Sequence, residues 1–171
     1  MQTGKPQSYL DSLISILSEE LEVHRQLLSL TQQERAVLSE SKATALNDVI
    51  SEKKYIVELL KEVERRRISL MAELGRIFKI VPKELTLRRL AELVDSETAK
   101  KLRFLREELM NVIMHLQKEN DTNQQLMIHF ISLVDSSIRM LNSVLYHEPT
   151  YANTGRYAME RGGGSILSGK I

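Results

Sequence analysis

The chain has 171 residues, of which 42% are hydrophobic, 27% charged and 5% aromatic, and its formal net charge is +1. These values are typical of one soluble globular domain. Because the chain has no cysteine, disulfides and thiolate metal sites are excluded. No apolar run approaches the roughly 18 residues of a membrane-spanning helix. Residues 1–8 also lack the apolar core of a signal peptide, so we expect a soluble, cytoplasmic protein.

The charge is distributed unevenly along the chain. Residues 1–52 carry a net charge of −4, residues 53–106 carry +7 and residues 107–171 carry −2. Acidic and basic helices that pack side by side would attract each other and account for this pattern. A basic surface for an acidic partner or for nucleic acid would account for it as well.

The first predicted helix covers residues 8–40. Ser8 is expected to cap its start, with Asp11 in the first turn, where a negative charge interacts favourably with the helix dipole. A mostly apolar stripe, which also includes His24 and Thr31, recurs at spacings of four and three, as is typical of a coiled coil or bundle. Its members are Leu10, Ile14, Leu17, Leu21, His24, Leu28, Thr31 and Leu38.

The second predicted helix covers residues 43–79, and Pro82 is expected to end it, because the residue before a proline avoids helical angles. One face of this helix is apolar. We assign five basic side chains to its outer face: Lys53, Lys54, Arg65, Arg66 and Arg67. A short connecting helix is predicted at residues 86–94.

A third long helix is predicted over residues 97–146, with Asp95 or Ser96 as its cap. It would be on the order of 75 Å long. A helix of that length is expected to pack against the first two rather than stay single. Residues 149–171 are rich in Gly, Ser, Tyr and Arg without periodicity, so we predict a flexible, disordered tail.

The predicted fold is all-α: an antiparallel, coiled-coil-like bundle of three long helices with a disordered C-terminal tail. The bundle domain is assigned to residues 1–148 and the tail to residues 149–171.

Two asparagines interrupt the apolar stripe of the last helix. Stepping from Leu116 by threes and fours lands on Asn120 and Asn123 before the stripe resumes at Leu126. A polar amide in a helix-packing seam lowers stability and is typically kept for register or for recognition. The sequence leaves both roles open.

No catalytic or metal-binding arrangement is visible. His115 and His129 lie about 21 Å apart on one helix, so they cannot share a metal. His24 lies on an apolar stripe and is interpreted as a core or boundary histidine. Residues 164–170 fit the start of a phosphate-binding loop, but Ile171 replaces its Ser or Thr, and the strand and helix that such a loop needs are absent. We predict a non-enzymatic protein with no cofactor and no small-molecule substrate.

Helix surfaces and the tail are therefore the candidate functional regions. Four of the seven methionines lie on the last helix, and flexible thioethers suit either a surface that receives an amphipathic helix or ordinary bundle packing. The candidate protein-binding residues are Met110, Met114, Asn120, Asn123, Met127, Phe130 and Val134. In the tail, Tyr151 beside small residues is a candidate docking element.

Several motifs occur in a recognisable order. Residues 27–38 are rich in leucine, residues 46–53 and 60–67 combine apolar residues with Lys53 and Arg67, residues 120–126 read NDTNQQL, and residues 151–155 read YANTG. In order and spacing they resemble the FlgN family of flagellar type III export chaperones over nearly the whole chain. The paired-asparagine element is the most specific of them.

The resemblance implies a cytosolic chaperone that binds the C-terminal amphipathic helices of hook–filament junction proteins, keeps them unassembled and delivers them to the type III export gate. The cytoplasmic domain of the export-gate membrane protein and the export ATPase complex are the further partners implied. The resemblance also implies that Tyr151 and Gly155 dock to the gate, although Ala152 and Asn153 stand where Gly and Pro often occur in the family.

Two other functions are considered. One is a self-associating coiled-coil scaffold without a client, since the sequence leaves a homo-oligomer open. The other is a basic helical nucleic-acid binder that acts through residues 53–106. The absence of interleaved aromatic residues and of a base-reading module disfavours nucleic acid.

Overall fold

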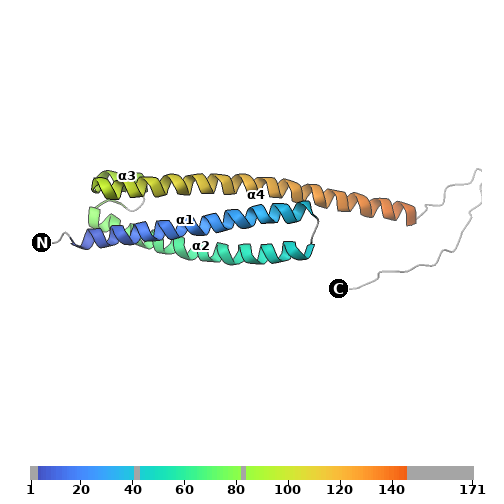
Figure 1. The fold of residues 1–171 in the computed structure, drawn as a ribbon, viewed down its shortest axis with the longest axis horizontal. Helices are drawn as coiled ribbons and strands as arrows, with labels where there is room; N and C mark the ends of the chain where they lie inside the picture. The colour runs from blue at the N-terminus through green and yellow to red at the C-terminus, as the bar shows by residue number, and fades with distance from the viewer. Residues whose placement is uncertain (1–3, 41–42, 82–83, 146–171) are drawn as a thin grey trace, which may run out of the picture. The chain divides into compact units, whose positions relative to one another are not determined.

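The computed structural model of the chain describes residues 4–40, 43–81 and 84–145. These residues form four helices and no strand (Figure 1): α1 (Gly4–Ser39), α2 (Ala43–Phe78), α3 (Leu87–Leu93) and α4 (Ser96–Leu145). The predicted all-α class is thus confirmed for this part of the chain. Helix α3 lies where the sequence predicts a short connecting helix at residues 86–94, and with the three long helices it makes four helices in the described residues.

The chain divides into two compact units, residues 1–128 and 129–171, and α4 contributes to both. In the first unit, α1 and the first part of α4 run in the same direction, and α2 runs in the opposite one (Figure 1). The second unit is described over residues 129–145. The predicted tail, residues 149–171, lies outside the described residues.

Helix α1 begins earlier than predicted. It starts at Gly4, and Ser8 lies inside the helix, where its carbonyl accepts a hydrogen bond of 2.9 Å from the Ser12 hydroxyl. Pro6 permits this start, because the N–H groups of a first helical turn have no acceptor within the helix and a proline there loses nothing. The prediction that Ser8 caps the helix is therefore wrong.

Helix α2 ends before Pro82 can act. Lys79 adopts a left-handed conformation with φ 56°, the Ile80 N–H donates to the Gly75 carbonyl at 2.9 Å, and the Lys79 N–H donates to the Arg76 carbonyl at 3.3 Å. These two bonds form a Schellman motif, which satisfies carbonyls that the helix end leaves without partners. The local backbone, and not the proline, ends α2 at Phe78.

The start of α4 agrees with the sequence prediction. The Asp95 carboxylate accepts hydrogen bonds of 3.0 Å from the Glu97 and Thr98 N–H groups, so it caps the helix that begins at Ser96. These bonds lower the pKa of the Asp95 carboxyl below its ordinary value. Thr86 caps α3 in the same way, since its hydroxyl accepts from the Arg89 N–H at 3.1 Å.

The apolar core of the first unit consists of two clusters. The larger one joins α1, α2, α3 and α4 through Leu10, Leu13, Leu17, Leu21, Leu74, Leu85, Leu90, Ala91, Ala99, Leu102, Leu105, Leu109 and Val112. The smaller one joins α1, α2 and α4 through Val23, Leu27, Leu30, Ile56, Val63 and Leu116. Burial of these side chains is what holds the long helices together, because apolar burial is the dominant stabilising term in folding.

A buried polar layer lies where the first cluster gives way to the second. Glu20 and His24 of α1 are buried, and the Glu20 Oε2 atom lies 2.9 Å from the Arg67 Nε atom of α2, although the two are not aligned as a hydrogen bond. The His24 Nδ1 atom lies 2.8 Å from the Glu20 carbonyl oxygen. His24 is thus a satisfied core histidine, as the sequence predicts, whereas Arg67 faces inward and not outward.

Burial raises the pKa of the Glu20 carboxyl above its ordinary value, and the nearby charges of Arg67 and His24 oppose this shift. A carboxylate removed from water loses more solvation than its partners restore, which is the usual behaviour of a buried ion pair.

Ion pairs between α1 and α2 account for part of the uneven charge of the chain. Glu19 pairs with Arg66, Glu20 with Arg67, and Glu34 with Lys53. Several further basic residues of α2 pair with carboxylates one turn away on the same helix: Lys61, Arg65 and Arg76. Attraction between an acidic and a basic helix, one of the two interpretations of the sequence, is therefore confirmed for α1 and α2.

None of the helices in the described part of the chain is both long and apolar enough to cross a membrane.

Candidate functional site

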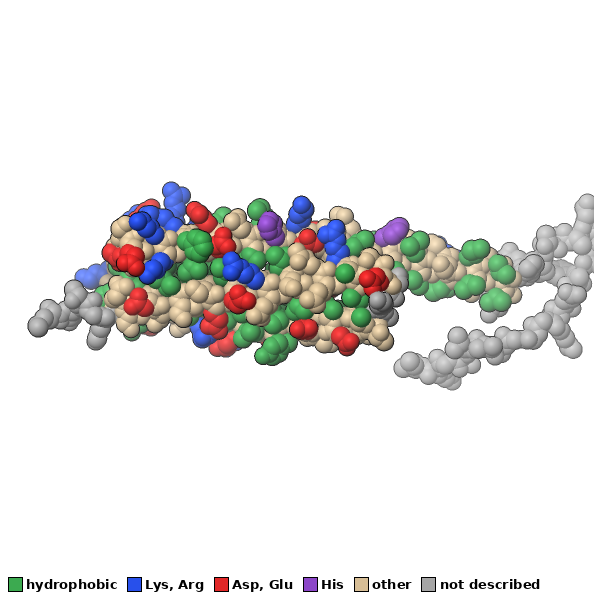
Figure 2. Space-filling model, viewed as in Figure 1, with side chains coloured by type: hydrophobic (Ala, Val, Ile, Leu, Met, Phe, Trp, Pro, Cys, Tyr) green, Lys and Arg blue, Asp and Glu red, His purple; other side chains and the backbone are tan. Residues whose placement is uncertain are grey.

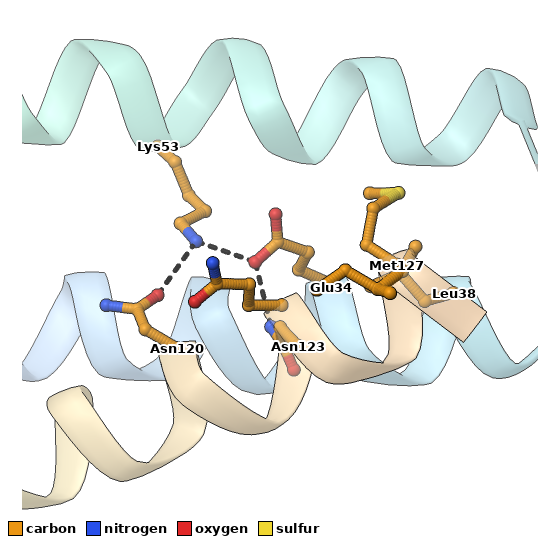
Figure 3. A pocket seen from close by; sticks show the side chains of 8 residues that line it. Glu34, Leu38, Lys53, Asn120, Asn123 and Met127 are labelled. Atoms are coloured by element: carbon orange, nitrogen blue, oxygen red, sulfur yellow. Dashed lines mark hydrogen bonds and ion pairs between the residues drawn. The ribbon is translucent and has the colours of Figure 1, made fainter. Parts of the chain in front are cut away.

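A cluster of polar side chains joins the three long helices near the end of α1. We call Glu34, Lys53, Asn120 and Asn123 the polar cluster (Figure 3). The Glu34 Oε2 atom accepts hydrogen bonds from Lys53 Nζ at 2.6 Å and from Asn123 Nδ2 at 2.8 Å. Lys53 Nζ also donates to Asn120 Oδ1 at 3.4 Å. One carboxylate therefore links α1 to both α2 and α4.

Asn123 is the most deeply placed member of the polar cluster, with only 5% of its surface exposed. Its Nδ2 atom also donates to the Thr31 carbonyl of α1 at 2.8 Å, and Thr31 itself is fully buried. The Asn123 Oδ1 atom is buried without a hydrogen-bond partner among the described residues. These contacts support the register role for Asn123, because all its described partners belong to this same bundle.

A pocket of about 280 Å³ opens beside the polar cluster. Its lining combines the polar cluster with a further amide, Gln124, and with three apolar side chains, Leu38, Met127 and Ile128. Figure 3 shows Met127 and Leu38 next to each other beside Glu34. The structure thus brings three predicted site residues together here, namely Asn120, Asn123 and Met127.

The second unit displays an exposed apolar face. All side chains of residues 129–145 are exposed, including those with helical spacing: Ile131, Val134, Ile138, Leu141 and Leu145. Polar residues occupy the other side of this stretch, among them Ser132, Asp135, Arg139 and Asn142. Hydrophobic side chains are visible at the surface of this part of α4 in Figure 2. A contiguous apolar face of this kind marks an interaction surface. We call residues 129–145 the exposed α4 segment.

The predicted site residues fall on different surfaces. Phe130 and Val134 belong to the exposed α4 segment. Met110 and Met114 are 53% and 57% exposed and lie on the side of α4 that faces away from the seam of Leu109, Val112 and Leu116. One partner helix cannot cover both the surface of Met110 and Met114 and the polar cluster at once. Tyr151 and Gly155 lie outside the described residues.

Glu34 and Lys53 are the site residues that sequence reasoning missed, since only their place in family-like motifs was noted and Lys53 was assigned to the outer face of its helix. Both occupy seam positions: Glu34 follows Thr31 by three residues, and Lys53 follows Val49 by four. A polar residue at a seam position was the signal, the same one that identifies Asn120 and Asn123.

The described residues show no arrangement for metal chemistry. Among them, no group of three or more His, Asp or Glu side chains could hold a metal ion. His115 and His129 are both exposed.

The comparison with family models gives one match, to the FlgN protein family, and it covers residues 1–158. No match is found among curated proteins or among solved structures. The matched range includes all four helices, the polar cluster and the exposed α4 segment. The chain therefore belongs to the FlgN family, a family of flagellar export chaperones.

Proposed function

We propose that this chain is a cytoplasmic, non-enzymatic chaperone that binds the C-terminal amphipathic helices of hook–filament junction proteins. It keeps these clients unassembled and delivers them to the type III export gate. The observation that carries the proposal is the exposed α4 segment, an amphipathic helix whose apolar face is open to solvent.

Apolar burial supplies the binding energy in this proposal. Val134, Ile138 and Leu141 are all exposed, and each buried apolar side chain contributes about 1.5–3 kcal/mol when it is removed from water. A client helix with apolar residues at spacings of three and four would lay that stripe along these side chains, as helix-in-groove complexes do. Phe130 widens the contact.

Charge plays a small part on this surface. Asp135 and Arg139 of the exposed α4 segment pair with each other at 2.6 Å, so they offer little net charge to a partner. We therefore infer that client recognition depends on the apolar pattern and is only weakly sensitive to salt.

Delivery is proposed to involve the tail. Tyr151 and Gly155 would dock to the cytoplasmic domain of the export-gate membrane protein, and the export ATPase complex would be a further partner. Support for this step is the family match, which extends to residue 158 and so includes both residues.

The first test is calorimetric titration of the full chain with the C-terminal segments of the two hook–filament junction proteins of the same organism. We expect saturable binding with a negative heat-capacity change, the mark of apolar burial. Absence of binding to either segment by the folded chain would contradict the proposal.

A pair of matched variants locates the surface. Replacing Val134 and Ile138 by serine should abolish client binding without loss of helix content, because both side chains are exposed. Replacing Met110 and Met114 by serine is the control and should leave client binding intact. Loss of binding in the control variant instead would mean that the client lies along the other side of α4.

Self-association is the alternative function that the exposed α4 segment also suits. A second copy could cover the same apolar face, which would make the chain a scaffold. Sedimentation of the free protein and of the Val134→Ser/Ile138→Ser variant separates the two, since a scaffold would be oligomeric only in the unsubstituted chain.

A further inference from the structure

The side of α4 that faces away from the bundle carries an unusual combination of side chains. Stepping by threes and fours along one face gives Lys100, Arg103, Arg106, Met110 and Met114. We call these five residues the outer α4 surface. Along this face, three basic residues are thus followed by two exposed methionines.

On the outer α4 surface, Lys100 and Arg103 are exposed and Arg106 is half-buried. Lys100, Arg103 and Arg106 form no ion pair with any described residue, in contrast to Lys101 beside them, which pairs with Glu97 at 2.9 Å. Glu107 borders the surface, so three positive charges against one negative charge leave a surplus of two. Lys and Arg side chains, together with some carboxylates, appear at the surface over α3 and the first part of α4 in Figure 2.

The two methionines are not explained by the bundle. Both are more than half exposed, whereas the neighbouring seam residues Leu109 and Val112 are buried. Exposed methionines suit adaptable contact with an amphipathic helix. Met110 and Met114 are one turn apart, so together they form an apolar contact about one helical turn long.

We propose that the outer α4 surface docks an acidic amphipathic helix of a second protein partner. Aliphatic side chains of that helix would contact Met110 and Met114, and Asp or Glu side chains of the same helix would lie against Lys100, Arg103 and Arg106. This interface is separate from client binding, because none of its five residues belongs to residues 129–145.

The test uses three synthetic helical peptides with one shared apolar stripe and with Glu, Ser or Lys at the flanking positions. Fluorescence anisotropy with the full chain should rank them Glu above Ser above Lys. Replacing both Lys100 and Arg103 by glutamine should lower the affinity for the Glu peptide roughly tenfold, in line with about 0.7 kcal/mol for each exposed charge contact. Added salt should weaken it as well.

Two further variants separate this surface from the exposed α4 segment. Replacing Met110 and Met114 by serine should also weaken the Glu peptide, whereas replacing Val134 and Ile138 by serine should not. An affinity ranking that ignores the flanking charge, or binding that is lost only in the Val134 and Ile138 variant, would overturn the proposal.

Nucleic acid is the competing ligand, since an exposed Phe104 lies beside Arg103 and could stack on a base. A single-stranded oligonucleotide is therefore titrated in parallel. If the oligonucleotide binds more tightly than the Glu peptide and loses affinity in the Lys100 and Arg103 variant, the surface binds nucleic acid and the peptide proposal is wrong.

Discussion

Two stretches of α4 have the same apolar spacing and opposite environments. Leu102, Leu105, Leu109, Val112 and Leu116 are all buried in the first unit. Ile131, Val134, Ile138, Leu141 and Leu145 are all exposed in the second. Apolar periodicity therefore defines a face suited to packing but does not determine which molecule covers it.

The same comparison explains why the exposed α4 segment carries the functional proposal. A folded chain gains stability from the first stretch, because its side chains leave water on folding. The second stretch contributes no such gain in the free protein. Its side chains leave water only when a partner covers them, so their apolar character is consistent with a role in binding.

The strongest test of this comparison makes the same substitution in both stretches. Leu102→Ala should lower the free energy of unfolding by about 2–5 kcal/mol, because Leu102 is completely buried. Leu141→Ala should change it by less than about 0.5 kcal/mol, because Leu141 is 59% exposed. Urea unfolding measures both. Equal losses that depend on protein concentration would show that a second copy covers the exposed α4 segment.

A second test addresses the polar cluster, which lies at the end of the first unit. Asn123→Ala removes one hydrogen bond to a carbonyl and one to the Glu34 carboxylate, so it should lower stability by about 1–3 kcal/mol. Asn120→Ala is the control and should have a small effect, because Asn120 is exposed and its side-chain bond to Lys53 is long at 3.4 Å. A stable Asn123→Ala variant that fails to bind client would assign Asn123 to recognition instead.

A third test uses pH to examine the buried layer between the two apolar clusters. The pKa of Glu20 is raised above its ordinary value of 4.5, so at intermediate pH the folded chain holds a proton that the unfolded chain has released. The free energy of unfolding therefore falls as pH rises from 4.5 through the folded-state pKa, by about 1.4 kcal/mol for each unit of separation.

Glu20→Gln removes this titration, so the stability of the unsubstituted chain relative to the variant should decrease over that pH range. Chemical unfolding at a series of pH values measures the difference. A relative stability that increases with pH would mean that attraction to Arg67 outweighs burial.

The smallest effect is expected at the end of α2. Lys79 adopts positive φ, which a residue with a Cβ atom adopts at a cost of about 1–2 kcal/mol. Lys79→Gly should relieve part of that cost and raise the free energy of unfolding by up to about 1 kcal/mol after the entropy of glycine is subtracted. Lys79→Ala keeps the Cβ atom and should show no gain. Thermal unfolding compares the two.

Much of the fold could be predicted from the sequence. The spacing of apolar residues locates all four helices, since a seam repeats every three or four residues whatever its partner. The cap at Asp95 follows from a carboxylate before a helical pattern. The start of α1 and the end of α2 could not be predicted in this way. The first turn around Pro6 and the positive φ of Lys79 are features of the backbone that apolar spacing does not record.

The site was only partly predictable. Asn120 and Asn123 were identified because they interrupt an apolar stripe, and Lys53 and Arg67 interrupt one in the same way. Basic side chains are ordinarily expected on an outer face. Only the packing of α1 beside α2 shows that Lys53 pairs with Glu34 and Arg67 with Glu20. The sequence analysis placed Met110 and Val134 in one candidate site. It could not separate them, because the surroundings of Met110 depend on which side of α4 packs in the first unit.

Two partly buried ion pairs between α1 and α2 restrict how this sequence can diverge. Glu20 and Glu34 are 14 residues apart in α1, and their partners Lys53 and Arg67 are also 14 residues apart in α2. That interval is two heptads, so both pairs lie on one seam. An insertion or deletion within either interval would separate one pair while the other stayed in place. Relatives should therefore vary freely in length at the tail or at the connections, but keep these two intervals equal.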